Sequence, residues 1–120
     1  MNVFGAGALA GAQTTQINLH GGEAANIYGG SFEEGICQTT NVNVPVTSTV
    51  AVKSLYGGSK GKNASLPCDV ETANIIVKSD QAYVSDTIFG GNHAYRAVEK
   101  TNIDIQVPVR MEPGGTLVNV

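Results

Sequence analysis

The sequence predicts an all-β fold, a single-stranded parallel β-helix solenoid of about four coils, from three observations. Two short phrases recur in fixed alternation, four times each. The second phrase alternates aliphatic and other side chains, which is typical of a strand with one buried face. Glycine returns at one place in each repeat, and no segment has convincing helical periodicity. Repeats of this kind indicate structural units that stack and share one core.

The first phrase combines an aliphatic residue, an aromatic residue and glycine. Its copies are NVFGAG at 2–7, NIYGGS at 26–31, SLYGGS at 54–59 and TIFGGN at 87–92. The aromatic residues lie 24, 28 and 33 residues apart and are Phe4, Tyr28, Tyr56 and Phe89. Neighbouring side chains on a strand point to opposite faces. We therefore expect the aliphatic residues to face inward and the aromatic residues to face outward.

Glycine follows each aromatic residue, at Gly5, Gly29, Gly57 and Gly90. A corner that needs a positive φ would explain a glycine at this place. A close approach of the backbone between coils would explain it equally well. Both explanations make glycine a structural requirement of each coil.

The second phrase carries the other regular strand. Its copies are TQINL at 15–19, TNVNV at 40–44, ANIIV at 73–77 and TNIDI at 101–105. The expected inward column is Ile17, Val42, Ile75 and Ile103. The expected outward column is Gln16, Asn41, Asn74 and Asn102, whose amides can hydrogen-bond from coil to coil. Segments 49–52 and 81–85 are expected to add a third, less regular strand per coil.

Residues 1–120 are expected to form a single β-helix domain. The coils differ in length because the loops differ, most of all between residues 59 and 72, and a solenoid tolerates such insertions. The final residues, 116–120, read TLVNV and resemble the start of a fifth first-phrase strand. We therefore expect a segment of a longer solenoid, or one whose open ends meet further coils or another protein.

Charge and hydropathy exclude several classes of function. Seven Lys and Arg residues stand against ten Asp and Glu residues, so the net charge is −3 and no basic patch fits nucleic acid. The longest apolar run is far too short for a membrane span. His20 and His93 lie too far apart in the repeat to share a metal ion, and the calcium-binding glycine repeat does not match. We expect no cofactor and no metal.

The two cysteines occupy corresponding loops of consecutive coils. Cys37 and Cys68 lie five and seven residues before the aligned Val42 and Ile75. Neighbouring coils are about 4.8 Å apart, within the Cα range of a disulfide. A bridge that ties the longest loop and a pair of buried thiols both fit this spacing. A catalytic cysteine would need a partnering histidine, and the sequence places none there.

The aromatic column is the candidate ligand-binding face. Outward rings at Phe4, Tyr28, Tyr56 and Phe89 could form a flat platform for sugar rings or for a partner chain. The alternative is a ladder of rings that pack on one another and stabilise the stack. The free exchange of Tyr and Phe makes the hydroxyl dispensable, which favours the ladder.

The phrases NIYGGS and SLYGGS, together with strands such as TNVNV, resemble the glycine-rich right-handed β-helix repeats of bacterial surface and secreted proteins, within the pectin-lyase-like architecture. The resemblance covers nearly the whole chain, although the chain is much shorter than an enzyme of that family and its coils are unequal. It implies a right-handed solenoid, export or cell-surface display, and an adhesive, spacer or carbohydrate-contacting role.

Two functions follow as expectations. The first is a noncatalytic structural or adhesive module, with a polysaccharide or a host or cell-surface glycan as the expected partner. The alternative is a carbohydrate-active protein, a polysaccharide lyase or hydrolase or its binding segment. Such enzymes need clustered carboxylates, and the nearest approaches are Asp69 with Glu71 and Glu33 with Glu34. We read these acids as solvated loop charges and expect no catalytic residue.

Overall fold

The computed structural model describes residues 2–7, 9–63, 65–93, 98–107 and the backbone of 116–118. Within these ranges every regular element is a strand. The strands are β1 (Asn2–Phe4), β2 (Thr14–Asn18), β3 (Glu23–Tyr28), β4 (Cys37–Val44), β5 (Ala51–Tyr56), β6 (Val70–Val77), β7 (Tyr83–Phe89), β8 (Val98–Ile105) and β9 (Thr116–Val118). None of the described residues belongs to a helix long and apolar enough to cross a membrane.

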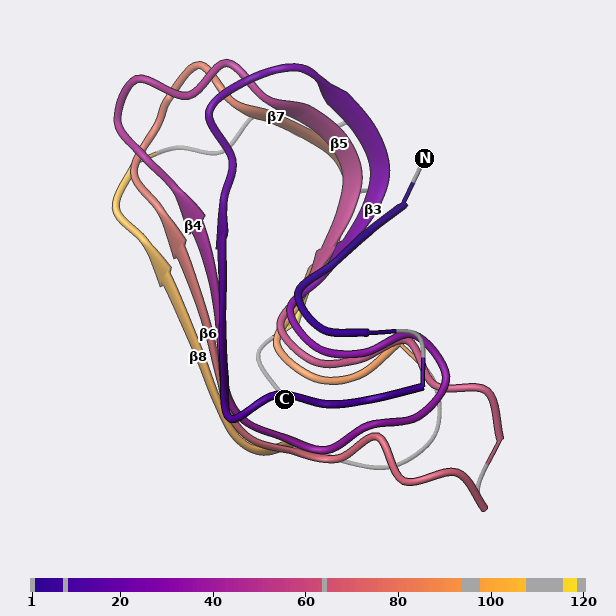
Figure 1. Cartoon of the computed structure of the whole chain (residues 1–120). Helices are drawn as coiled ribbons and strands as arrows, with labels where there is room; N and C mark the ends of the chain where they lie inside the picture. Colours follow the sequence, from indigo (N-terminus) through magenta and orange to yellow (C-terminus); the bar gives the residue numbers. More distant parts are fainter. Residues whose placement is uncertain (1, 8, 64, 94–97, 108–115, 119–120) are drawn as a thin grey trace.

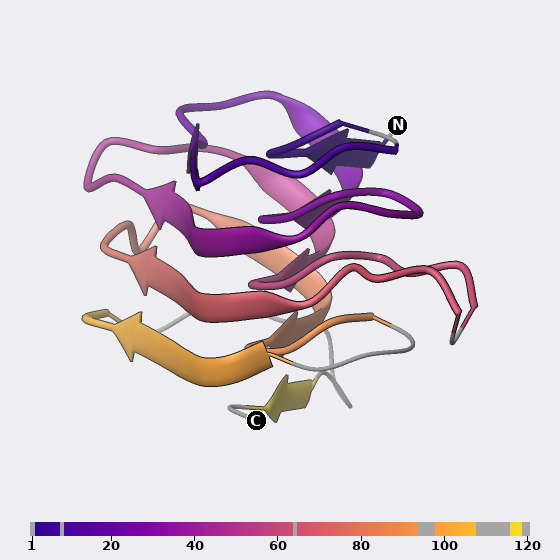
Figure 2. The same ribbon diagram turned by 60° about the horizontal axis from the view of Figure 1, so that its bottom comes forward.

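The strands form two parallel sheets between which the chain alternates. The odd-numbered strands pair in the order β1-β3-β5-β7-β9, and the even-numbered strands in the order β2-β4-β6-β8. Each strand therefore pairs with the strand two places along the chain, in parallel. We call one strand of each sheet, with its connecting loops, a rung. Figure 1 looks along the stack of rungs, and Figure 2 shows them one above another with β1 and β9 at opposite ends.

The pairing register confirms the alignment of the two phrases. Tyr28 pairs with Phe4 on one side and with Tyr56 on the other. In the second sheet Val42 pairs with Ile17 and with Ile75. Equivalent residues of the phrases thus stand directly above one another, and each kind of side chain forms a column through the stack.

The prediction of a third strand per coil, at residues 49–52 and 81–85, was wrong. These segments lead into β5 and β7, which continue without a break to the aromatic residue. The ribbons of β3, β5 and β7 curve strongly instead of ending (Figure 1). Between β5 and β7 the register shifts at Val52 and Ser54, so an extra residue of β7 is absorbed as a bulge. A bulge bends a strand while most of its hydrogen bonds continue.

The core lies between the two sheets and is aliphatic, as predicted. In the first sheet, Ile27, Leu55 and Ile88 are 0% exposed. They pack in one cluster with residues of the second sheet, Ile17, Val42 and Ile75 among them. β-Branched residues fit this environment because they pack well on a pleated, buried surface. The inward orientation of both aliphatic columns is confirmed.

The glycine after each aromatic residue is required by close backbone approach. Positive φ values occur at Gly22, Gly35 and Gly61, outside this column. A Cβ atom on Gly29 would meet the carbonyl oxygen of Gly57 in the next rung, and would lie 3.0 Å from Cβ of Thr40 in the opposite sheet. The same relation holds one rung earlier for Gly5, Gly29 and Thr15.

The opposing threonines use this proximity to form hydrogen bonds. The Thr15 hydroxyl donates to the Gly29 carbonyl at 2.5 Å, and the Thr40 hydroxyl donates to the Gly57 carbonyl at 2.5 Å. Both threonines are buried, at 3% and 0% exposure. A buried carbonyl without a donor would destabilise the fold, so this column also satisfies backbone polarity. We call these residues the glycine–threonine corner.

Replacing a glycine of this corner should destabilise the fold strongly. Gly29→Ala is expected to lower the free energy of unfolding by about 3 kcal/mol, because the added methyl group forces the rungs or sheets apart. Gly21→Ala is the matched control, since Gly21 is exposed and its Cβ would lie 3.2 Å from the Thr49 hydroxyl. Its expected effect is below about 0.5 kcal/mol. Chemical denaturation measures both, and equal midpoints would contradict the close-approach explanation.

Candidate functional site

The predicted aromatic column forms a continuous ladder of rings on the strand face away from the core. The Phe4 and Tyr28 ring centroids are 4.9 Å apart at an interplanar angle of 7°, and those of Tyr28 and Tyr56 are 5.0 Å apart at 8°. The next pair, Tyr56 and Phe89, is more open, at 6.0 Å and 52°. The spacing follows from the strand separation, because each ring extends from an equivalent backbone position in consecutive rungs.

Side chains from the following loops cover the ladder further. Phe32 stacks on Phe4 at 5.0 Å, and the Lys60 ammonium lies 4.6 Å above the Phe32 ring centre. The His93 ring meets Tyr56 edge-on, with centroids 5.1 Å apart. The ladder is therefore packed from two directions.

This geometry does not offer a flat platform at the middle of the column. Tyr28 is only 2% exposed, and its two ring faces are occupied by Phe4 and Tyr56. A sugar that stacks on an aromatic residue needs a free ring face. At this rung the rings instead stabilise the stack, which is the ladder alternative considered from the sequence.

A buried polar column, which sequence reasoning missed, runs beside the ladder. It consists of Ser31, Ser59 and Asn92, the residues that follow each Gly-Gly pair. The Ser31 amide donates to the Ser59 hydroxyl at 2.9 Å, and the Ser59 amide donates to Asn92 Oδ1 at 2.7 Å. The recurrence of a polar residue after Gly-Gly is visible in the sequence, at Ser31, Ser59 and Asn92. Their role is to connect the loops of consecutive rungs.

The two cysteines are buried and are not joined by a disulfide. In the register Cys37 pairs with Val70, so Cys68 is two residues out of step with it. Two residues of extended chain displace Cys68 by about 6.6 Å along the strand direction, in addition to the separation of about 4.8 Å between strands. The two Cα atoms are therefore beyond the range of a disulfide. Asn92 Nδ2 lies 3.3 Å from the Cys68 carbonyl oxygen and 3.6 Å from its sulfur. Of the two interpretations of the sequence, the structure has the buried thiols.

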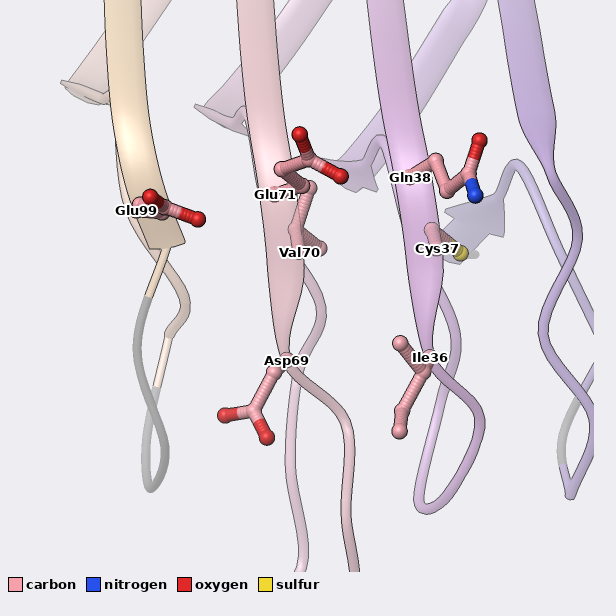
Figure 3. A pocket seen from close by; sticks show the side chains of 7 residues that line it. All are labelled: Ile36, Cys37, Gln38, Asp69, Val70, Glu71 and Glu99. Atoms are coloured by element: carbon pink, nitrogen blue, oxygen red, sulfur yellow. The ribbon is translucent and has the colours of Figure 1, made fainter.

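A groove of about 460 Å³ crosses the first residues of β4, β6 and β8 (Figure 3). Its lining residues are Ile36, Cys37, Gln38, Asp69, Val70, Glu71 and Glu99. Cys37 and Val70 are buried beneath it, whereas Ile36 is 58% exposed. The groove thus combines an apolar floor with carboxylates.

The carboxylates of the groove come from neighbouring strands. Val70 pairs with Val98 and Thr72 with Lys100, so Glu71 stands opposite Glu99. The sequence had singled out Asp69 with Glu71, and the structure adds Glu99 to them. In Figure 3 the Glu71 carboxylate is turned toward Gln38, while that of Asp69 lies on the β8 side of the strand. The other acidic pair lies elsewhere, and its Glu33 carboxylate is 3.7 Å from Lys62 Nζ.

Nothing in the described ranges groups three or more His, Cys, Asp or Glu residues in a way that could hold a metal ion. His20 and His93 belong to different loops, and His93 packs on the aromatic ladder. The described lining residues of the groove therefore supply negative charge and apolar contact.

Comparison with known proteins leaves the geometry as the evidence for function. No protein-family model matches the chain, and no curated protein or solved structure matches it.

The tyrosines of the ladder should make stability fall at alkaline pH. Burial raises the pKa of Tyr28 and Tyr56 above the ordinary value of 10.0; the neighbouring Tyr56 adds to the rise at Tyr28, and a Ser54 hydrogen bond partly offsets it at Tyr56. Above pH 10 the unfolded chain loses protons that the folded chain keeps. The contribution of these two tyrosines to the free energy of unfolding is therefore fully present below pH 10. It is lost as the pH rises through their folded-state pKa values.

Urea denaturation of the wild type and of Tyr28→Phe/Tyr56→Phe at pH 8 and at pH 11 measures this effect. The double variant keeps the stacked rings, so it should lose less stability than the wild type between these two pH values. The stability of the wild type relative to the double variant should therefore be lower at pH 11 than at pH 8. Parallel losses in both proteins would show that these hydroxyl groups do not cause the alkaline effect.

Proposed function

We propose that this chain is a noncatalytic structural module, a right-handed parallel β-helix segment whose repeated side chains hold one rung to the next. The observation that carries this is that the recurring columns are used in contacts between rungs. The aliphatic residues form the core, the rings form the ladder, and the glycine–threonine corner joins both sheets. Contacts of this kind between nearest neighbours are what stabilise a solenoid.

The outward amide column adds to the same support. Asn102 Nδ2 donates to Asn74 Oδ1 at 2.9 Å, and Asn74 Nδ2 donates to Asn41 Oδ1 at 3.1 Å. These three amides are directed along the stack as predicted, whereas the fourth member of the column, Gln16, donates to Asn18 Oδ1 of its own strand at 3.0 Å. Side chains committed to their neighbours in this way suit a stiff spacer better than a reactive surface.

The winding and the location are parts of the same proposal. Parallel strands joined by crossovers within a sheet are right-handed in nearly all known cases. The glycine-rich phrases resemble those of bacterial surface and secreted proteins, which favours display outside the cell. An adhesive role would add contact with a polysaccharide or a glycan to the spacer role.

Removal of one whole rung tests the solenoid. Thr40 and Ala73 are register partners, so deletion of residues 40–72 joins Thr39 to Ala73 without changing the phase of the columns. The shortened chain is expected to keep a β-sheet circular dichroism spectrum and a cooperative, lower-temperature unfolding transition, because only nearest neighbours must match. Failure of the shortened chain to fold, under conditions in which the full chain unfolds cooperatively, would contradict the solenoid.

A second candidate function, a polysaccharide lyase or hydrolase, is favoured by the carboxylates of the groove. When purified protein is incubated with a panel of neutral and acidic polysaccharides, we expect no new reducing ends, whether or not a polysaccharide binds. Asp69→Asn/Glu71→Gln should behave like the wild type in this assay. Cleavage by the wild type that the double variant loses would instead establish the enzyme.

Binding without cleavage that is lost in Tyr56→Ala, which removes a partly exposed ring of the column, would support the aromatic column as an adhesive face. Circular dichroism of each variant separates loss of binding from loss of fold.

A further inference from the structure

We propose that the groove lined by Ile36, Glu71 and Glu99 binds an extended segment of another protein, in which an apolar side chain is flanked by lysine or arginine. This goes beyond the spacer role, because the groove is built from residues that the repeated columns do not include. It requires three properties of the surface: a fixed apolar contact, a negative charge without a partner, and a length that suits an extended chain.

The apolar contact is held in place by its neighbours. Ile36 lies between Gly35, whose amide donates to the Pro67 carbonyl at 2.7 Å, and Cys37, whose amide donates to the Asp69 carbonyl at 3.1 Å. Its backbone also packs closely against Gly11, where a Cβ atom would meet the Ile36 carbonyl oxygen. The side chain nevertheless remains 58% exposed. Because the backbone at Ile36 is already held in place, a partner that covers this side chain need not order the backbone first.

Within the described part of the chain, neither Glu71 nor Glu99 forms an ion pair. Glu71 and Glu99 occupy corresponding positions on the neighbouring strands β6 and β8, about 4.8 Å apart, and the Glu71 carboxylate is turned toward Gln38 (Figure 3). The one ion pair among the described residues, between Lys62 and Glu33, involves neither of them. Like charges directly opposite in a sheet are destabilising. A cationic side chain placed across both carboxylates would remove this repulsion and add attraction.

The dimensions and chemistry select the occupant. Three strands span about 10 Å, which an extended segment of three or four residues covers at about 3.3 Å per residue. A bare metal ion is disfavoured because the described residues offer no group of three ligands. A sugar would lack a free aromatic face among the lining residues, which include no aromatic side chain. Charge complementarity to the two glutamates points to lysine or arginine, and Ile36 calls for an apolar side chain between or beside them.

Three capped, fluorescently labelled peptides test this by anisotropy titration at low salt: alternating lysine and valine, alternating lysine and serine, and alternating glutamate and valine. The lysine–valine peptide should bind at least about tenfold more tightly than either of the others. Its affinity should fall as NaCl is raised through physiological ionic strength, because exposed charges are then screened.

Two variants locate the binding. Glu71→Gln/Glu99→Gln should weaken binding of the lysine–valine peptide by at least about tenfold, and Ile36→Ser by at least about threefold. The matched control is Glu23→Gln/Asp80→Asn, which removes the same charge from exposed residues outside this groove. It should bind within about twofold of the wild type. Circular dichroism and thermal melting confirm that each variant is folded.

Several results would overturn the assignment. These are the absence of saturable binding up to about 1 mM peptide, equal loss in the control variant, and equal affinity for the glutamate–valine peptide. Sedimentation of the wild type without peptide measures whether the chain self-associates. Self-association that Glu71→Gln/Glu99→Gln abolishes would assign the groove to a second copy of this chain instead of a peptide partner.

Discussion

The close approach of the backbone at the glycine–threonine corner is the constraint on which the rest of the structure depends. Gly29 has no room for a Cβ atom, because the Gly57 carbonyl and the Thr40 side chain occupy that space. The hydroxyl of Thr40 then donates to the same carbonyl, so steric fit and hydrogen bonding act at one point. This corner joins a strand of one sheet to the opposite sheet and to the next rung, and it therefore fixes both the distance between sheets and the register within them.

Once the register is fixed, the side chains on either side of the corner have little freedom. The aliphatic residue two positions before the glycine enters the core, and the aromatic residue between them stacks on its equivalents in adjacent rungs. The serine or asparagine two residues after the glycine is buried among loop backbone groups. Every buried side-chain nitrogen or oxygen of the described residues has a hydrogen-bond partner. Burial of this much polarity is tolerated because the repeat supplies each donor with an acceptor one rung away.

The sequence predicted what recurs and failed where the chain is irregular. The two phrases gave the register of Ile75 and of Tyr56, because equivalent residues repeat. The prediction of a third strand was wrong because one curved strand, with a bulge, covers the stretch for which two strands were expected. No feature of the composition marks that bend. The separation of Cys37 from Cys68 depends on a two-residue offset between loops of unequal length. The sequence had singled out Asp69 with Glu71, but Ile36 and Glu99, which complete the groove, come from other strand starts and lie outside both phrases.

The contrast along one outward column argues that the groove serves something other than stacking. Gln13 and Gln38 are consecutive in this column and their amides hydrogen-bond at 3.3 Å, as the asparagines do further along the same sheet. The next two residues of the column are Glu71 and Glu99, two like charges at places where a pair of amides could hydrogen-bond. Stacking alone would favour glutamine at both places. Two glutamates without an ion pair among the described residues lie beside an exposed isoleucine, at places where a neutral hydrogen-bonded pair would fit. A partner that uses the charge explains this choice of residues better than stacking does.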